Sequence, residues 1–195
     1  MSKTEEMIRF FTLNPGVHSR KGLVKVGAYP ALLRKLVTNN ILEEVSRGFY
    51  RLIDQEELEN DDLETIASVI PNGVFCLQSA LHFHNLGTQQ AFEYHLAIPK
   101  GQWIPERNEF NIKIYQFGKQ AYGSGIEKHG TIKVYSVAKT IADCFKFRNQ
   151  IGLDIALEAL KDVIRNKRAT IAEILDQAEV CRVKNVIMPY LESMS

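Results

Sequence analysis

Residues 24–52 read VKVGAYPALLRKLVTNNILEEVSRGFYRL, and this stretch decides the fold of the chain. Pro30 lacks an N–H and fixes φ, so it favours the first position of a helix. The apolar residues that follow it recur at the spacing of one helical face: Leu32, Leu33, Leu36 and Val37. Asn39 and Asn40 tolerate the left-handed backbone that ends a helix. The pattern therefore predicts a helix that begins with proline.

A second helix is predicted before this one, and a hairpin after it. Ser19 can cap a helix that Gly27 ends. Gly22 lies inside that helix at a cost of about 1 kcal/mol relative to Ala, so we expect the helix to be short or to start late. Gly48 supplies a turn between residues that favour strands. This order of elements predicts a winged helix-turn-helix domain over residues 1–52.

Charge is unevenly distributed along the chain. Residues 1–52 hold nine basic and four acidic side chains, a net charge of +5, whereas the whole chain carries only +1. Residues 53–65 hold seven acidic side chains and no basic one. A basic surface attracts phosphate through counterion release. We therefore expect a head that binds double-stranded DNA, followed by an acidic segment, 53–65, that is a linker or the start of a helix.

The expected domain type indicates which side chains would contact DNA, because it places one helix in a groove and the hairpin on the flanking backbone. Polar side chains off the apolar face of the proline-started helix form the predicted groove-facing set: Tyr29, Arg34, Lys35 and Thr38. At the hairpin tip, Arg47 is the predicted contact to minor groove or phosphate. The start of the first helix is predicted to hold backbone phosphates through Ser19, Arg20 and Lys21.

The composition is that of a soluble globular protein, with 45% hydrophobic and 24% charged residues among 195. No apolar run approaches the roughly 18 residues that span a membrane. The N-terminal MSKTEEMIRFF lacks the apolar region of a signal peptide. The cysteines are odd in number and far apart, which favours a reducing cytoplasm over a disulfide framework or a zinc site: Cys76, Cys144 and Cys181.

Residues 66–195 alternate strand and helix patterns, and we expect one larger domain there. Strands are predicted at 73–77, 93–98, 109–117 and 126–135, the last as a hairpin that turns at His129-Gly130. Helices are predicted at 78–86, 136–145, 153–164, 170–178 and 186–194. Pro189 should kink or restart the final helix. The fold class expected for the whole chain is α+β, a winged helix-turn-helix followed by a larger α+β domain with a helical C-terminal end.

No catalytic or metal-binding constellation is recognisable in the sequence. His82 and His84, two residues apart on a helix, point to different faces, so we expect one packed and one exposed histidine rather than a metal site. The glycine-rich segment 118–125 lacks the order of a phosphate-binding loop and predicts a flexible loop. The helical spacing of an acid and two bases predicts a pair on the helix surface: Lys139, Asp143 and Lys146. We expect no enzyme, no catalytic residue, no cofactor and no metal.

The chain resembles the AbiEi-type antitoxins of bacterial type IV toxin–antitoxin (abortive infection) systems. The head LLRKLVTNNILEEVSRGFYRL, residues 32–52, resembles their N-terminal winged-helix domain. QSALHFHNL, residues 78–86, resembles their Ser-Ala-Leu-x-x-His-Gly-Leu helix, with Asn85 in place of the usual glycine. VYSVAKTIAD, residues 134–143, resembles their Arg/Lys-Thr-x-x-Asp segment, and PYLE at residues 189–192 also agrees.

The resemblance implies two activities in a bacterial cytoplasm. The head would bind inverted repeats in the promoter of its own operon and repress it, and the larger domain would counteract a nucleotidyltransferase-like toxin encoded nearby. Three alternatives stay open on the residues alone. The chain could be an orphan winged-helix regulator without a toxin, or a DNA-targeted enzyme with an unrecognised site. It could also be a pure protein-interaction module, since winged helices also serve as dimerisation units.

Overall fold

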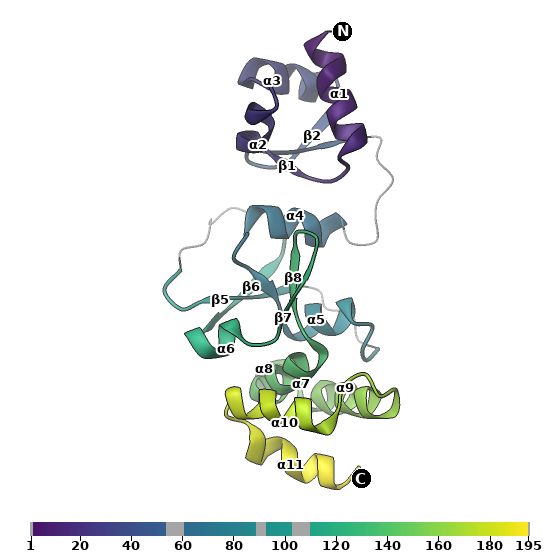
Figure 1. Ribbon diagram of the computed structural model, residues 1–195, viewed down its shortest axis with the longest axis vertical. Helices are drawn as coiled ribbons and strands as arrows, with labels where there is room; N and C mark the ends of the chain where they lie inside the picture. Colours follow the sequence, from purple (N-terminus) through teal and green to yellow (C-terminus); the bar gives the residue numbers. More distant parts are fainter. Residues whose placement is uncertain (1, 54–60, 89–92, 103–109, 195) are drawn as a thin grey trace. The chain divides into compact units, whose positions relative to one another are not determined.

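The computed structural model describes residues 2–53, 61–88, 93–102 and 110–194, and Figure 1 shows their helices and strands. Two compact units divide these residues: those up to Pro71 form the first, and those from Asn72 onward form the second. The sequence placed this boundary earlier, in the acidic segment, of which residues 54–60 lie outside the described part. Helix α4, Asp61–Val69, begins within that segment and belongs to the first unit.

The first unit holds the helix pair and the hairpin expected from its sequence. Strands β1, β3 and β2 form an antiparallel sheet in that order. Ahead of α4, the elements follow one another as α1 (Lys3–Leu13), β1 (His18–Ser19), α2 (Arg20–Lys25), α3 (Pro30–Thr38), β2 (Leu42–Ser46) and β3 (Phe49–Leu52). Pro30 occupies the first turn of α3, and Asn40, with φ +52°, follows its C-terminus, as the sequence predicted.

Helix α2 is short, and its sequence explains where it starts. Ser19 is its N-cap, and the Ser19 hydroxyl oxygen accepts a hydrogen bond of 3.1 Å from the Gly22 N–H. Gly22 therefore lies in the first turn, where backbone N–H groups have no carbonyl partner within the helix. A Cβ atom at Gly22 would lie 3.3 Å from the Ser19 oxygen. The glycine thus allows the hydroxyl to approach closely, in a helix of six residues.

The apolar face of α3 closes the core of the first unit. The three leucines of this face are at most 3% exposed, and they pack with residues of α1, α2, β2 and β3. This core consists of Met7, Phe11, Leu23, Ala28, Leu32, Leu33, Leu36, Leu42 and Tyr50. Burying one leucine contributes on the order of 1.5–3 kcal/mol, so these contacts fix the rotation of α3 about its axis.

The second unit is built on a mixed sheet with strand order β6-β5-β4-β8-β7. Its strands are β4 (Val74–Phe75), β5 (Tyr94–Pro99), β6 (Ile112–Phe117), β7 (Ile126–His129) and β8 (Ile132–Tyr135). The pairs β4–β8 and β5–β6 are parallel, whereas β4–β5 and β7–β8 are antiparallel. The hairpin β7–β8 turns at His129-Gly130 as predicted. Together the two units confirm the predicted α+β fold class.

Helices pack on this sheet and extend beyond it at the C-terminal end, where Figure 1 shows α7 to α11 gathered together. They are α5 (Leu77–Phe83), α6 (Lys119–Gly123), α7 (Val137–Lys146), α8 (Arg148–Ile151), α9 (Leu153–Arg165), α10 (Ile171–Val180) and α11 (Lys184–Glu192). Two details differ from the sequence-based expectation. The glycine-rich segment contains the short helix α6 rather than only a loop, and α11 runs through Pro189 without restarting. Among the described residues, none of the helices is both long enough and apolar enough to cross a bilayer.

The prediction of a surface pair on α7 is wrong, because Lys139 and Asp143 are both fully buried. The Lys139 ammonium lies 2.5 Å from Asp143 Oδ2 and 4.1 Å from the centre of the Tyr135 ring. The Cys181 thiol donates a hydrogen bond of 3.2 Å to Asp143 Oδ1. Burial raises the pKa of Asp143, and the Lys139 charge and these hydrogen bonds oppose that shift. The i, i+4 spacing does bring the two side chains together, but α10 packs on this helix and the aromatic rings of Phe117 and Tyr135 from the sheet lie against Lys139.

Removing one member of this buried ion pair should destabilise the protein, because the other charge is then buried without a partner. Lys139→Met removes the cation beside the Asp143 carboxylate, and we expect the free energy of unfolding to fall by about 3–5 kcal/mol in urea titrations. The double variant Lys139→Met/Asp143→Leu buries no charge and should recover most of that loss. Lys146→Met removes an exposed charge from the same helix and should change stability by less than about 0.5 kcal/mol. A double variant no more stable than Lys139→Met would contradict the uncompensated-charge explanation.

Candidate nucleic-acid interface

The predicted groove-facing side chains lie on the exposed face of α3, opposite its buried leucines. Arg34, Lys35 and Thr38 are exposed, and Tyr29, the N-cap residue, has 50% of its surface exposed. The helix has no acidic residue in its first turn. This face therefore presents two cations, a hydroxyl and an aromatic ring to solvent.

The hairpin tip lies beside the start of α2. The backbone N–H of Arg20 donates a hydrogen bond of 2.6 Å to the carbonyl oxygen of Gly48, and Ser19 pairs with Phe49 across β1 and β3. Gly48 has φ +80°, a backbone conformation that the turn requires and that glycine adopts readily. The structure thus brings the predicted phosphate contacts at Ser19 and Arg20 close to the predicted wing contact, the exposed Arg47.

The pKa of the Tyr50 hydroxyl on β3 depends on charged groups from several elements. Burial raises the pKa of the Tyr50 hydroxyl, Glu44 raises it further by charge and by a hydrogen bond, and the charges of Arg20 and Arg34 lower it. Both guanidinium groups therefore act on the same hydroxyl. The hydrogen bond from the Arg20 N–H to Gly48 places the start of α2 beside the hairpin, which the order of residues in the sequence could not show.

Glu44 is a site residue that the sequence-based interpretation missed. Its Oε1 atom accepts a hydrogen bond of 2.7 Å from the Gly48 N–H, so its carboxylate holds the hairpin turn from β2. A glutamate four residues before the turn glycine was the available signal. Elsewhere in the hairpin, Arg51 and Glu43 form an ion pair of 2.8 Å, so acidic side chains offset part of the basic charge on these strands.

Ser19 has a structural role in addition to the predicted one. It is half-buried, and its oxygen accepts the Gly22 N–H as the N-cap of α2. A hydroxyl can accept one hydrogen bond and donate another, so capping is compatible with a contact to phosphate. Lys21, in the first turn of α2, is exposed and carries no such structural bond among the described contacts.

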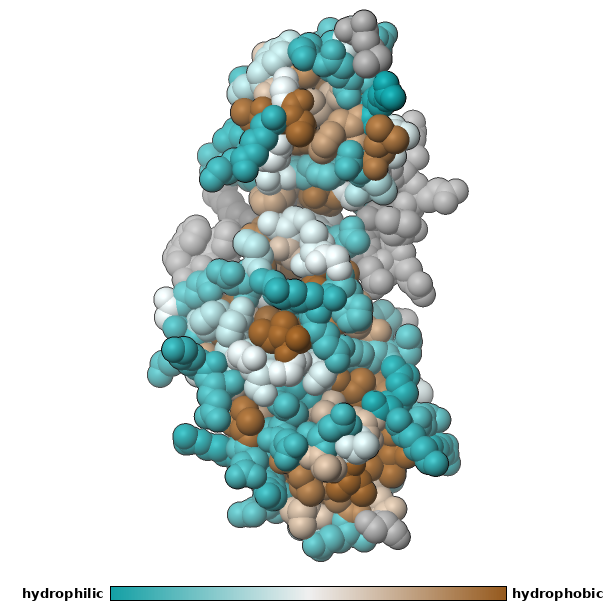
Figure 2. All heavy atoms as spheres, viewed as in Figure 1, coloured by the Kyte–Doolittle hydropathy of each residue, from teal (hydrophilic) through white to brown (hydrophobic). Residues whose placement is uncertain are grey.

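Exposed apolar side chains are scattered among the polar ones on the first unit, as brown and teal spheres show in Figure 2. The large exposed hydrophobic residues of this unit are Leu13, Val24, Val26, Tyr29 and Ile53. Three of them lie at the end of α2 or between α2 and α3: Val24, Val26 and Tyr29.

The second unit contains two histidines that the sequence singled out, His82 and His84, and three cysteines. His82 is exposed and His84 is buried, with its Nε2 atom 2.7 Å from the Tyr135 carbonyl oxygen, which confirms the expectation of one packed and one exposed histidine. The three cysteines are free and buried, and burial raises the pKa of the Cys181 thiol to about 12. The described part of the chain contains no cluster of three or more His, Cys, Asp or Glu side chains that could hold a metal ion.

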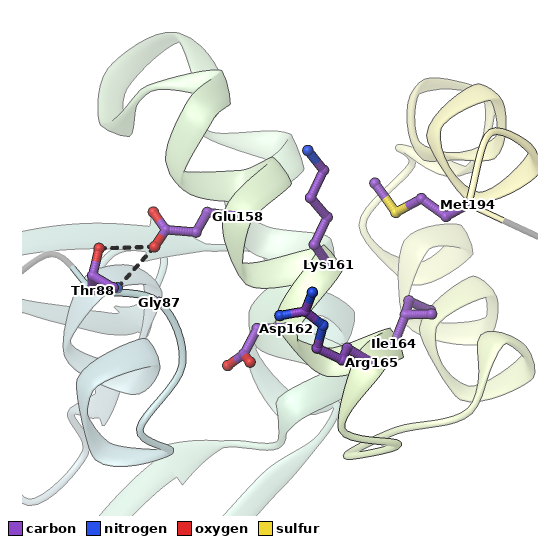
Figure 3. A pocket seen from close by; sticks show the side chains of 8 residues that line it. All are labelled: Gly87, Thr88, Glu158, Lys161, Asp162, Ile164, Arg165 and Met194. Atoms are coloured by element: carbon purple, nitrogen blue, oxygen red, sulfur yellow. Dashed lines mark hydrogen bonds between the residues drawn. The ribbon is translucent and has the colours of Figure 1, made fainter.

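A surface pocket of about 560 Å³ lies along α9 in the second unit and is shown in Figure 3. At one side, the Thr88 hydroxyl donates a hydrogen bond of 2.8 Å to Glu158 Oε1, and the Thr88 N–H donates one of 3.1 Å to the same atom. Lys161 and Arg165 line the same pocket together with Asp162. The Asp162 carboxylate also accepts a hydrogen bond of 2.5 Å from the side-chain amide of Asn166, the C-cap residue of α9. The pocket mixes charges of both signs, and the Thr88 hydroxyl in it is held by the Glu158 carboxylate.

Comparisons with known proteins show likeness in fold. No protein-family model matches the chain, and no curated protein sequence matches it. Among solved structures, the chain is similar to the Rv2827c protein from Mycobacterium tuberculosis, with a TM-score of 0.66 and 10% sequence identity. The similarity covers 90% of this chain and 71% of that one. At this identity the likeness shows a shared α+β architecture.

The capping role of Ser19 can be tested by stability. Ser19→Ala removes the acceptor for the Gly22 N–H, and we expect it to destabilise the first unit by about 0.5–2 kcal/mol. Ser19→Asp supplies another good N-cap acceptor and should keep stability near the original value. Hydrogen exchange of the backbone amides of residues 19–38 during urea titration measures the effect within this unit. Equal destabilisation by both substitutions would exclude capping as the cause.

Proposed function

We propose that this protein is a DNA-binding transcriptional repressor whose first unit is a winged helix-turn-helix, with α3 in the major groove and the β2–β3 hairpin as the wing. One observation carries the proposal: α3 presents exposed cations, and the start of α2, also basic, is hydrogen-bonded to the hairpin turn through the Arg20 N–H and the Gly48 carbonyl oxygen. Helix-turn-helix proteins use this combination of a groove helix and flanking backbone contacts.

The roles of the individual side chains follow from their places. Arg34 and Lys35 lie on the groove-facing side of α3 between Tyr29 and Thr38. Lys21 and Arg47 are both exposed, and each is the sequence neighbour of a residue in the hydrogen bond that joins Arg20 of α2 to Gly48 of the hairpin. On this proposal the DNA backbone passes there. The net charge of +5 over residues 1–52 attracts the phosphates and accelerates the encounter with DNA.

The second part of the proposal is antitoxin activity in the second unit, directed against a nucleotidyltransferase-like toxin encoded nearby. Its support is the resemblance of residues 78–86 and 134–143 to AbiEi-type antitoxins. On this proposal the chain is not an enzyme, needs no cofactor, acts in the bacterial cytoplasm and represses its own operon through inverted repeats in the promoter.

The electrostatic part of DNA binding can be tested by salt titration. Lys21→Ala should weaken binding to all sequences alike and reduce the slope of log affinity against log salt concentration by about 1, because one phosphate contact is lost. Lys128→Ala, an exposed lysine of the second unit, makes the same change in net charge and should leave the slope unaltered. Fluorescence anisotropy with the chain's own upstream DNA provides the measurement. Binding without salt dependence would contradict this part of the proposal.

The two activities should be separable. The triple variant Lys21→Ala/Arg34→Ala/Arg47→Ala changes exposed residues of the first unit alone, so it should lose repression of a promoter reporter while still protecting cells from the toxin. The measurement pairs reporter expression with growth during toxin co-expression. Loss of protection at an unchanged protein level would mean that the first unit takes part in neutralisation. A wild-type chain that gives no protection would refute the antitoxin role and leave the repressor role standing.

A further inference from the structure

The exposed face of α3 carries a specific set of chemical groups. Ala31, Arg34, Lys35 and Thr38 are all exposed, and their spacing of i, i+3, i+4 and i+7 places them on one face of the helix. Since the buried leucines fix the opposite face, this set is the part of α3 that a groove would meet. It comprises one methyl group, two cations, and a hydroxyl with a second methyl group.

This set can read some bases and not others. Arginine pairs through two hydrogen bonds with guanine O6 and N7, and methyl groups contact the C5-methyl of thymine. Adenine is read bidentately by Asn or Gln, and the amino group of cytosine by Asp or Glu. The sequence of α3, PALLRKLVT, contains none of these four residue types. The bidentate and methyl contacts that the helix offers in the major groove are therefore those of guanine and thymine, whereas the Thr38 hydroxyl does not discriminate between bases.

Spacing along the helix sets the order of these bases. Ala31 and Thr38 lie one turn on either side of the cations, and a turn rises about 5.4 Å, or one to two base-pair steps of about 3.4 Å. Both methyl groups can thus reach base pairs next to the one that the cations contact. Of the two cations, Arg34 carries the planar guanidinium, which matches the paired acceptors of guanine better than the ammonium of Lys35 does.

We propose that α3 reads a guanine flanked by thymine, with Arg34 donating hydrogen bonds to guanine O6 and N7 and the methyl groups of Ala31 and Thr38 contacting the neighbouring thymine methyl. This inference rests on the proposed DNA-binding function and specifies its target sequence. Lys35 contacts phosphate or a second guanine and is not the residue that selects the first one.

The experiment begins with selection of duplexes from a randomised pool by the full chain at low salt. The enriched sequences should share a guanine with a thymine within two base pairs. In the best of them, 7-deazaguanine at that position lacks the N7 acceptor and should weaken binding about tenfold. Uracil in place of the thymine lacks one methyl group and should weaken binding about threefold.

Variants of the chain assign these effects to residues. Arg34→Ala should bind more weakly and no longer distinguish guanine from 7-deazaguanine, whereas Lys35→Ala should keep the distinction. A reversed result would overturn the assignment to Arg34. Binding that is indifferent to both base analogues, or an enriched pool without guanine, would overturn the inference while DNA binding itself stands. No retention of any duplex at low salt would refute the proposed function and the inference with it.

Discussion

Burial of the leucines on one face of α3 is the constraint on which the first unit depends. Leu32, Leu33 and Leu36 pack with residues from the other elements of the unit. A helix of nine residues held at three positions cannot rotate about its axis without exposing them. The same packing that stabilises the unit therefore selects Arg34 and Lys35 as its outward-facing cations. Stability and the proposed recognition of DNA follow from one arrangement.

The hairpin shows how a basic surface can depend on an acidic residue. Glu44 holds the turn by accepting the Gly48 N–H and contacts the Tyr50 hydroxyl, close to Arg20 and Arg34. Its negative charge works against attraction of phosphate, yet it fixes the turn from which Arg47 projects. A contact residue on an ordered turn loses less conformational entropy on binding than one on a mobile loop, which offsets part of the electrostatic cost.

The second unit places the buried Lys139–Asp143 pair at its centre. These residues belong to the segment that resembles the Arg/Lys-Thr-x-x-Asp motif of AbiEi-type antitoxins, and both are fully buried. Thr140, the second residue of the motif, is also buried, and its hydroxyl donates to the Tyr135 carbonyl. The side chains of Lys139, Thr140 and Asp143 therefore lie inside the unit rather than on its surface. Any surface through which this unit meets a partner has to be sought among other residues.

Local chemistry determined much of this protein from the sequence alone. Pro30, Gly48 and the leucine spacing were sufficient for the helix pair, the hairpin and the exposed face of α3, because helix starts, turns and amphipathic faces depend on neighbouring residues. Only the tertiary structure showed that the hairpin turn is hydrogen-bonded to the start of α2, and that the Lys139–Asp143 pair is buried. Such facts depend on which distant segments pack together, and spacing within one helix carries no information about what covers it.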